Sequence, residues 1–363
     1  MLSQLLVACD NSNDVKTQHK ISLDEINTSA GIFSERTLAS TQAASHHIDL
    51  LNKSIALFLS EPTEDNRLAL GESWKKSHGT MIISGTQPSA DDLPASRSSS
   101  LLYHIDAWPI QPGYVDSIDG YPSSGIVNDS TVSLSAESLA LQHGFSDTEE
   151  IIFGFHPLEY LIFAKTALDY QQQEHRQTSI QAIDVTQQTV YEDPSEDPIY
   201  RRRTLLRLLG NELKDSVSTY LATRLEQVPY APSVSENQQQ AARTAITLID
   251  VAHSHATRGF EESHLLLDSD QSHSMYSQTT HLDVSQRLGS LSSMLNEPTW
   301  LSSSLRRVDK RIEQDLQTTL AQGILIVEKG RFSESDRARL VTVFSALRHQ
   351  LADLRIKLGG DDY

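Results

Sequence analysis

The sequence predicts an all-α protein. Apolar residues recur at intervals of three and four through most of the chain, and no convincing alternation of apolar and polar residues indicates a strand. Proline and glycine divide these periodic segments into pieces of helix length. At 363 residues the chain exceeds the size at which one hydrophobic core usually stops growing. We therefore expect two packed, four-helix-bundle-like helical bundles, with a long irregular loop in the first.

The first bundle is expected to open with an antiparallel helical pair over residues 31–59 and 63–83. Pro62 separates the two helices, and Thr63 is placed to cap the second one. One apolar stripe of the first helix consists of Ile48, Leu51, Ile55 and Leu59.

Residues 84–133 differ in kind, because proline, glycine, serine and aspartate recur there and break helices. The first half of this segment is poor in apolar residues and could be disordered. The second half is expected to be packed down and ordered, because it contains Trp108, Tyr114, Tyr121 and Ile126.

The remaining helices follow the same spacing. A long helix is expected to start at Pro198 and to end before Pro229, and Ser235 is placed to cap the next one. Residues 260–282 form a crossing rich in serine and histidine. The other expected helices cover residues 135–143, 147–169, 282–295, 299–327 and 334–358. A division near residue 195 gives three parts: 1–29 as signal remnant and polar tether, 30–195 as the first bundle, and 196–363 as the second.

The chain is strongly acidic, with 48 acidic against 30 basic residues and a formal net charge of −18. Nucleic-acid binding needs a basic surface, so we expect no nucleic-acid partner. An acidic protein suits the handling of cations.

The N-terminal sequence "LLVAC" looks like a bacterial lipobox, in which a lipidated cysteine becomes the mature N-terminus. Cys9 is the one cysteine of the chain, and a polar segment follows it as a tether would. Only eight residues precede it, and none of them is Lys or Arg, which departs from a full secretory signal. We expect a lipid-anchored protein; the alternative is an inert thiol in a disordered N-terminus. No other segment approaches the length of a membrane span.

The segment "GFHPLEYLIF" at 154–163 places a histidine and a glutamate three positions apart within an apolar run. On a helix His156 and Glu159 share one face, and such a pair suits iron, zinc, manganese or copper. Two alternatives need no metal. His156 could cap a helix that starts at Pro157, with Glu159 completing a capping box, or the pair could form a hydrogen bond in a wet groove.

Several segments in order resemble the imelysin family, also known as insulin-cleaving or iron-regulated proteins. The pattern Gly154-x-His156-x-x-Glu159 matches the signature of the family. The segments "SWKKSHGTM", "IDAWPIQPGYVDSIDGYPSSGIVND" and "SMYSQTTHLD" are similar to the helix with a tryptophan, the loop and the serine-containing crossing of that family. The resemblance covers most of residues 30–358. It implies two helical bundles with the His–Glu motif in a cleft between them, a periplasm-facing lipoprotein linked to iron uptake, and a metallopeptidase label.

Two adjacent ligands do not complete a metal site. The inverse zinc-peptidase pattern His-x-x-Glu-His fails here, because its last position is Tyr160. Further ligands must come from elsewhere, and the candidates are Glu72, His104, Asp106, Asp119 and His143. The wider set of candidate cleft residues is Gly154, Glu72, Trp74, Asp106, Trp108, Asp119, Arg201 and Ser277.

Four further features have competing interpretations. Trp108 could line the cleft or anchor the loop, and Arg201 could belong to a solvated basic turn or bind an anion in the cleft. Ser277 lacks the Gly-x-Ser-x-Gly context of a nucleophile. The histidines of the second half could buffer metal or lie on a solvated surface, and we expect the solvated surface; these are His253, His255, His264, His273 and His281.

We therefore expect an envelope lipoprotein, facing the periplasm and anchored to the outer membrane, that binds a divalent or trivalent metal ion. Iron is expected first, with zinc or copper as alternatives, and the partners are the ion or an iron-carrying ligand and other envelope proteins of iron uptake. The alternatives are a metallo-endopeptidase in which Glu159 polarises a water, and a protein that binds a peptide or another ligand without metal.

Overall fold

The computed structural model describes residues 21–84, 101, 104–171, 194–227, 236–267, 272–296 and 301–360. In chain order the elements are α1 (Leu23–Ser60), α2 (Glu64–Ser84), α4 (Pro112–Val115), the 3-10 turn η1 (Ile126–Asn128), α5 (Ala136–Gln142), α6 (Phe155–Phe163), the 3-10 turns η2 (Ala167–Tyr170) and η4 (Pro194–Glu196), α8 (Pro198–Gln227), α9 (Gln238–Leu265), α10 (Thr280–Leu295), α11 (Leu301–Val308), α12 (Lys310–Val327) and α13 (Glu334–Lys357). The described part of the chain contains no strand, only an isolated bridge between Ile118 and Tyr121. The predicted all-α class is confirmed.

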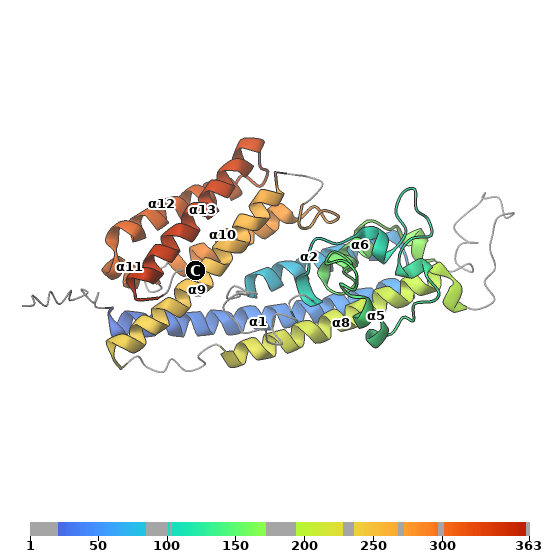
Figure 1. Cartoon of the computed structure of the whole chain (residues 1–363), viewed down its shortest axis with the longest axis horizontal. Helices are drawn as coiled ribbons and strands as arrows, with labels where there is room; N and C mark the ends of the chain where they lie inside the picture. The colour runs from blue at the N-terminus through green and yellow to red at the C-terminus, as the bar shows by residue number, and fades with distance from the viewer. Residues whose placement is uncertain are drawn as a thin grey trace, which may run out of the picture.

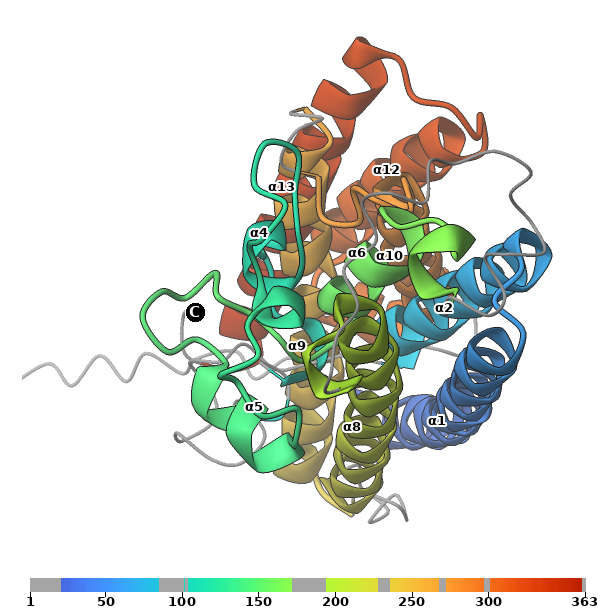
Figure 2. The ribbon, with the colours of Figure 1, turned by 90° about the vertical axis from the view of Figure 1, so that its right-hand side faces the viewer.

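Two hydrophobic cores hold these helices together. One core gathers side chains of α9 to α13 and of the first turns of α1. The other gathers α2, α6, α8, the irregular segment between α2 and α6, and the later turns of α1. Helix α1 therefore runs along both cores, as Figure 1 shows, with α8 beside it and α12 on the far side of α9. Figure 2 likewise shows α12 and α8 at opposite ends of the molecule.

Helix α1 begins earlier than predicted. Residues 1–29 were expected to be a signal remnant and polar tether, but Ser22 accepts a hydrogen bond from the backbone N–H of Glu25 and starts the helix there. Ile26 is fully buried in the core of α9 to α13. This burial is a long-range contact, so local periodicity did not reveal it. The stripe from Ile48 to Leu59 is buried as predicted.

The predicted division near residue 195 stays a prediction. The core that α8 joins is relevant to it. This helix was expected to open the second bundle. Its buried side chains, among them Leu205, Leu209 and Leu213, instead join the core of α2 and α6. The reason is that α8 pairs with the later turns of α1.

Four other local predictions change. Residues 147–154 are not helical, so the expected helix 147–169 shortens to α6 and the turn η2. The expected helix 299–327 is interrupted at Asp309, whose carboxylate accepts from the N–H groups of Arg311 and Ile312 and starts α12. Ser235 lies outside the described residues, and Asn237 caps α9. Tyr121 was expected to pack and is exposed.

Within the described residues, no helix combines the length and the apolar character needed to cross a bilayer.

Candidate metal centre

Helix α6 starts at a glycine that no other residue could replace without strain. Gly154 has a φ of +109°, and a Cβ atom there would lie 2.7 Å from the carbonyl oxygen of Ile105. This close approach holds the irregular segment against the start of α6. Pro157 is the third helical residue, where a missing N–H costs nothing.

The motif histidine and glutamate meet as their spacing predicted. The Nδ1 atom of His156 lies 3.2 Å from the Oε2 atom of Glu159, and each side chain is only 1% exposed. The N-cap of α6 is Gly154, so the alternative in which His156 caps a helix starting at Pro157 is wrong.

Helix α2 contributes His78, which the sequence analysis did not single out. Its ring stacks on Trp74, one turn earlier, with ring centroids 4.9 Å apart. The indole N–H of Trp74 donates to the backbone carbonyl of Phe155 at 3.0 Å. Trp74 therefore fixes both the orientation of His78 and the position of the first turn of α6.

The irregular segment contributes Asp106. Its Oδ1 atom lies 3.2 Å from Nε2 of His156 and 3.4 Å from Nε2 of His78. The side chain of Asp106 is 29% exposed, whereas the two imidazoles are almost fully buried. Asp106 thus faces both histidines and the outside of the site.

The segment before α10 contributes His273. Its Nε2 atom lies 3.2 Å from Nε2 of His156. Its Nδ1 atom lies 3.4 Å from Oδ2 of Asp283, a buried residue in the first turn of α10. The other carboxylate oxygen of Asp283 lies 3.6 Å from Nδ1 of His78, and Ser274 donates to Oδ2 at 2.8 Å.

These contacts form two layers. In the inner layer, ligand-type atoms of His78, Asp106, His156 and His273 all lie within 4.8 Å of one another. In the outer layer, Glu159 and Asp283 face the Nδ1 atoms of the three histidines. Ionised carboxylates only accept hydrogen bonds, so Nδ1 carries a hydrogen in each ring, and Nε2 keeps its lone pair in the neutral form of the ring. Three such lone pairs and a carboxylate repel one another unless a proton or a metal cation lies among them.

The charges of the cluster shift its pKa values strongly. Burial lowers the pKa of His156, but hydrogen bonds to Asp106 and Glu159 outweigh burial and raise the pKa to about 9. Burial also opposes the charged form of His78, yet the charges of Asp283 and Asp106 raise its pKa. Burial would raise the pKa of the Asp106 carboxyl, but hydrogen bonds from His156 and His78 hold it well below its usual range.

Glu159 lies outside the inner layer. One oxygen faces His156, and the other accepts from both the backbone N–H and the hydroxyl of Ser277, each at 2.7 Å. Glu159 therefore links α6 to the segment that carries His273.

The other predicted cleft residues divide into two groups. Gly154, Trp74, Asp106, Trp108 and Ser277 lie at or beside the centre. Glu72 and Asp119 are exposed, and Glu72 pairs with Lys75. Arg201 is buried, but it donates to the backbone carbonyls of Ile126, Val127, Asp129 and Val132 and holds that loop in place.

The remaining histidines were predicted either as further metal ligands or as residues of a solvated surface. His104 and His143 stack on each other, and Nδ1 of His143 accepts from the N–H groups of Ile152 and Phe153. The prediction of a solvated surface is wrong for His273 and His255, which are 9% and 2% exposed. Cys9 lies outside the described residues.

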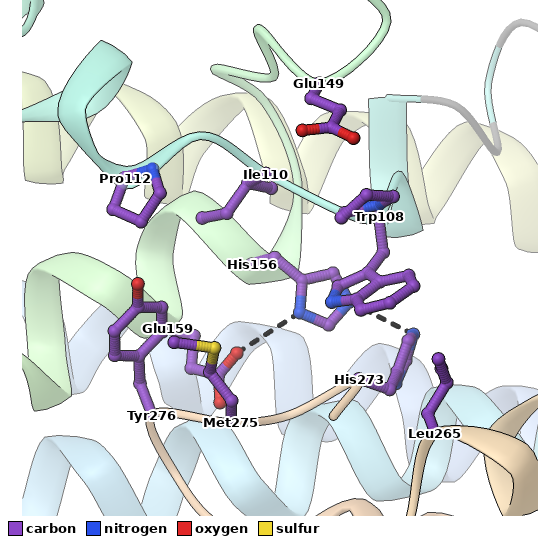
Figure 3. Close-up of a pocket in the computed structure, with 11 residues that line it drawn as sticks. Trp108, Ile110, Pro112, Glu149, His156, Glu159, Leu265, His273, Met275 and Tyr276 are labelled. Atoms are coloured by element: carbon purple, nitrogen blue, oxygen red, sulfur yellow. Dashed lines mark hydrogen bonds and ion pairs between the residues drawn. The ribbon is translucent and has the colours of Figure 1, made fainter. Parts of the chain in front are cut away.

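A cavity of about 380 Å³ opens over the centre, with His156, Glu159 and His273 at its base (Figure 3). Its walls are largely apolar and aromatic: Trp108, Pro109, Ile110, Pro112, Leu265, Met275 and Tyr276, with Glu149 beside them.

Comparisons with known proteins agree with this architecture. The family model described as Imelysin (Peptidase_M75) matches residues 37–354. An imelysin-like protein from Psychrobacter arcticum 273-4 has a similar fold, with a TM-score of 0.60 and 14% identity over 94% of this chain and 97% of that one. A protein described as an iron-regulated protein A precursor, from Parabacteroides distasonis ATCC 8503, gives a TM-score of 0.55 and 12% identity over 94% and 95%. No match is found among curated proteins.

Proposed function

This chain belongs to the imelysin family, and we propose that it binds a metal ion with His78, Asp106, His156 and His273, in the service of iron acquisition at the cell envelope. The observation that carries the proposal is the convergence of one ligand-type atom from each of three histidines and one aspartate, all within 4.8 Å of one another. The resemblance to an iron-regulated precursor supports iron as the cargo.

The donor set fits a borderline transition metal. Imidazole nitrogen suits iron, zinc and copper, and a carboxylate oxygen extends the range toward iron and manganese. Magnesium and calcium favour sites made of oxygen, so a centre with three imidazoles discriminates against them. A bound metal would act as a Lewis acid and bind further donor atoms.

The outer carboxylates match what metal-ligating histidines require. Such histidines donate their second ring N–H to a carboxylate or carbonyl, which fixes the tautomer and the ring orientation. Here Glu159 serves His156, and Asp283 serves His78 and His273. We assign Glu159 this orienting role, in place of the direct ligand role that the spacing of the motif predicted.

The same contacts weigh against proteolysis. A hydrolytic zinc site keeps one position for water and has a base beside it. Here both oxygens of Glu159, the base that this hypothesis needs, already accept hydrogen bonds from His156 and Ser277. We therefore place metal binding before the endopeptidase hypothesis.

Titration of metal-stripped protein with Fe(II), Fe(III), Cu(II) and Zn(II) tests the proposal. We expect one tight site in the wild type and a loss of at least about 100-fold in affinity for His156→Ala, since even an outer-layer change costs about 10–100-fold. His104→Ala is the matched control, because His104 lies outside the inner layer. Equal affinity of all three proteins would remove the cluster from the function. Chelator-sensitive cleavage of an unfolded substrate would instead favour the endopeptidase.

We also propose that Cys9 is lipidated and that the protein is anchored to the outer membrane, facing the periplasm. The lipobox-like "LLVAC" supports this, and Cys9 precedes the first described helix by more than ten residues. Membrane fractionation of cells that produce Cys9→Ser tests it. Retention of that variant in the membrane fraction would contradict a lipid on Cys9.

A further inference from the structure

We propose that the cavity over the metal centre binds a second, organic ligand that is neutral or cationic and has an apolar, aromatic body. The inference rests on the proposed metal centre and names the class of molecule that meets the metal there. It differs from the capture of a bare ion, which the inner layer alone would achieve.

The size of the cavity is the first argument. A volume of about 380 Å³ lies within the range of pockets for small organic molecules, about 300–1,000 Å³. A single ion with its waters needs no wall of tryptophan, isoleucine and methionine. An apolar wall instead lowers the free energy of a ligand whose own apolar surface leaves water on binding.

The position of the cavity is the second argument. His156 and His273 belong both to the inner layer and to the lining of the cavity. The ring of Trp108 lies 6.0 Å from that of His273, centroid to centroid, and overlaps His156 in the view of Figure 3. A ligand that packs on Trp108 therefore has a donor atom within reach of the metal.

Charge is the third argument, and it sets the class of ligand. Among the described residues that line the cavity, none is Lys or Arg, whereas Glu149 and Glu159 are both carboxylates. Asp106, Glu159 and Asp283 together outweigh a divalent ion by one negative charge. An anionic chelate would meet this potential with no Lys or Arg in the lining to compensate it, and like charges so placed repel one another.

The competing occupant of the cavity is an anionic metal chelate. It would need Lys or Arg at the cavity, and neither is found among the described residues that line it. A neutral ligand with a nitrogen donor and an aromatic ring fits the apolar walls, the metal at the base and the carboxylates of the lining.

Calorimetry on the metal-loaded protein tests the inference with three probes. Imidazole has the donor without the body, 4-phenylimidazole has both, and 4-(imidazol-4-yl)benzoate adds a carboxylate to the same body. We expect 4-phenylimidazole to bind at least about tenfold more tightly than either of the others, as burial of the ring and like-charge repulsion require. Loaded with Co(II), the protein should change its visible spectrum on binding.

Two variants test the aromatic wall and the charge of the cavity separately. Trp108→Ala should abolish the preference for the probe with a phenyl ring. Glu149→Lys should make the affinities of the neutral and the carboxylated probe similar. Glu35→Lys is the control for charge, because Glu35 is exposed on α1 and does not line the cavity.

The outcomes are distinct. Metal uptake with no preference among the probes, or tightest binding of the carboxylated one, would overturn this inference and leave the metal centre standing. Equal binding of 4-phenylimidazole to metal-free and metal-loaded protein would also overturn it. A flat metal titration would overturn the proposed function and this inference together.

Discussion

The Nε2 atoms of His156 and His273 lie 3.2 Å apart, although 117 positions separate the two residues in the sequence. Each ring turns its other nitrogen toward a buried carboxylate, Glu159 for one and Asp283 for the other. Two imidazoles so oriented bring lone pairs together, and this arrangement is stable around a proton or a metal. Testable consequences follow from this geometry and from the packing that supports it.

His273→Ala is expected to weaken metal affinity by at least about 100-fold, because it removes one of four inner donors. His281→Ala is the matched control from the same serine- and histidine-rich segment. His281 stacks edge-on against Phe332 and stands outside the inner layer. Competition with a chromophoric chelator measures both affinities. Similar losses in the two variants would contradict the assignment of His273.

Glu159→Gln is expected to lower metal affinity by about 10–100-fold while the protein stays folded. The amide has nearly the shape of the carboxylate, but its NH₂ group can donate to Nδ1 of His156 and place the hydrogen on Nε2, where the metal should bind. The same titration measures the effect, with circular dichroism as the check on folding.

Ser277→Ala is the companion to that change. It removes the hydroxyl but keeps the backbone N–H that also donates to Glu159. We expect a loss of less than about tenfold, since Glu159 keeps one of its two donors from this residue. A larger effect than that of Glu159→Gln would show that Ser277 acts in another way.

Metal should stabilise the fold, because the inner layer joins α2, the irregular segment, α6 and the segment before α10. At a free concentration of a hundred times Kd, we expect a gain of about 2.7 kcal/mol in the free energy of unfolding. Chemical denaturation with metal and with a chelator measures it. His78→Ala should lose most of this gain; an equal gain in that variant would place the metal elsewhere.

The metal-free protein should lose stability as pH rises from about 6.5 to about 9. The pKa of His156 is raised from 6.5 to about 9 in the folded state, so its contribution is complete below pH 6.5 and disappears above pH 9. Metal affinity should rise over the same window, because a metal must displace that proton. Denaturation curves and titrations at several pH values check both. A metal-free protein that grows more stable across this window would be inconsistent with the raised pKa.

A last prediction concerns the frame around the site. Asp116 is fully buried, and Arg202 donates to both of its oxygens. Arg202→Ala leaves a buried carboxylate without its main partner and should cost about 3–5 kcal/mol. Lys214→Ala, which breaks an exposed ion pair with Asp49, should cost less than about 1 kcal/mol. Urea unfolding measures both; equal costs would mean that water reaches Asp116.

The contact within the motif in α6 could be predicted from the sequence, because it depends only on the spacing of two residues within one helix. A spacing of three on a helix brings His156 and Glu159 to one face, and Nδ1 of His156 lies 3.2 Å from Oε2 of Glu159. Asp106, Trp74 and Ser277 were reached through family resemblance, and they lie at or beside the centre.

Three essential groups escaped sequence analysis. His78 lies one turn after Trp74 on the same helical face, and that spacing was the available signal. His273 lies in a polar segment whose composition indicated a solvated surface, but α10 and α6 enclose it. Asp283 resembles any first-turn acidic residue until its two oxygens are seen facing His273 and His78.

The sequence by itself determined the helices, their order and the two motif residues, because helical periodicity, caps and i,i+3 neighbours are properties of short segments. The tertiary structure alone decided that α1 spans both cores, that α8 joins the core around the site, and that three distant histidines converge. Such convergence depends on how helices pack, and packing is set by complementary surfaces that lie far apart along the chain. The role of Glu159 changed for the same reason: its partner Ser277 reaches it only in the folded protein.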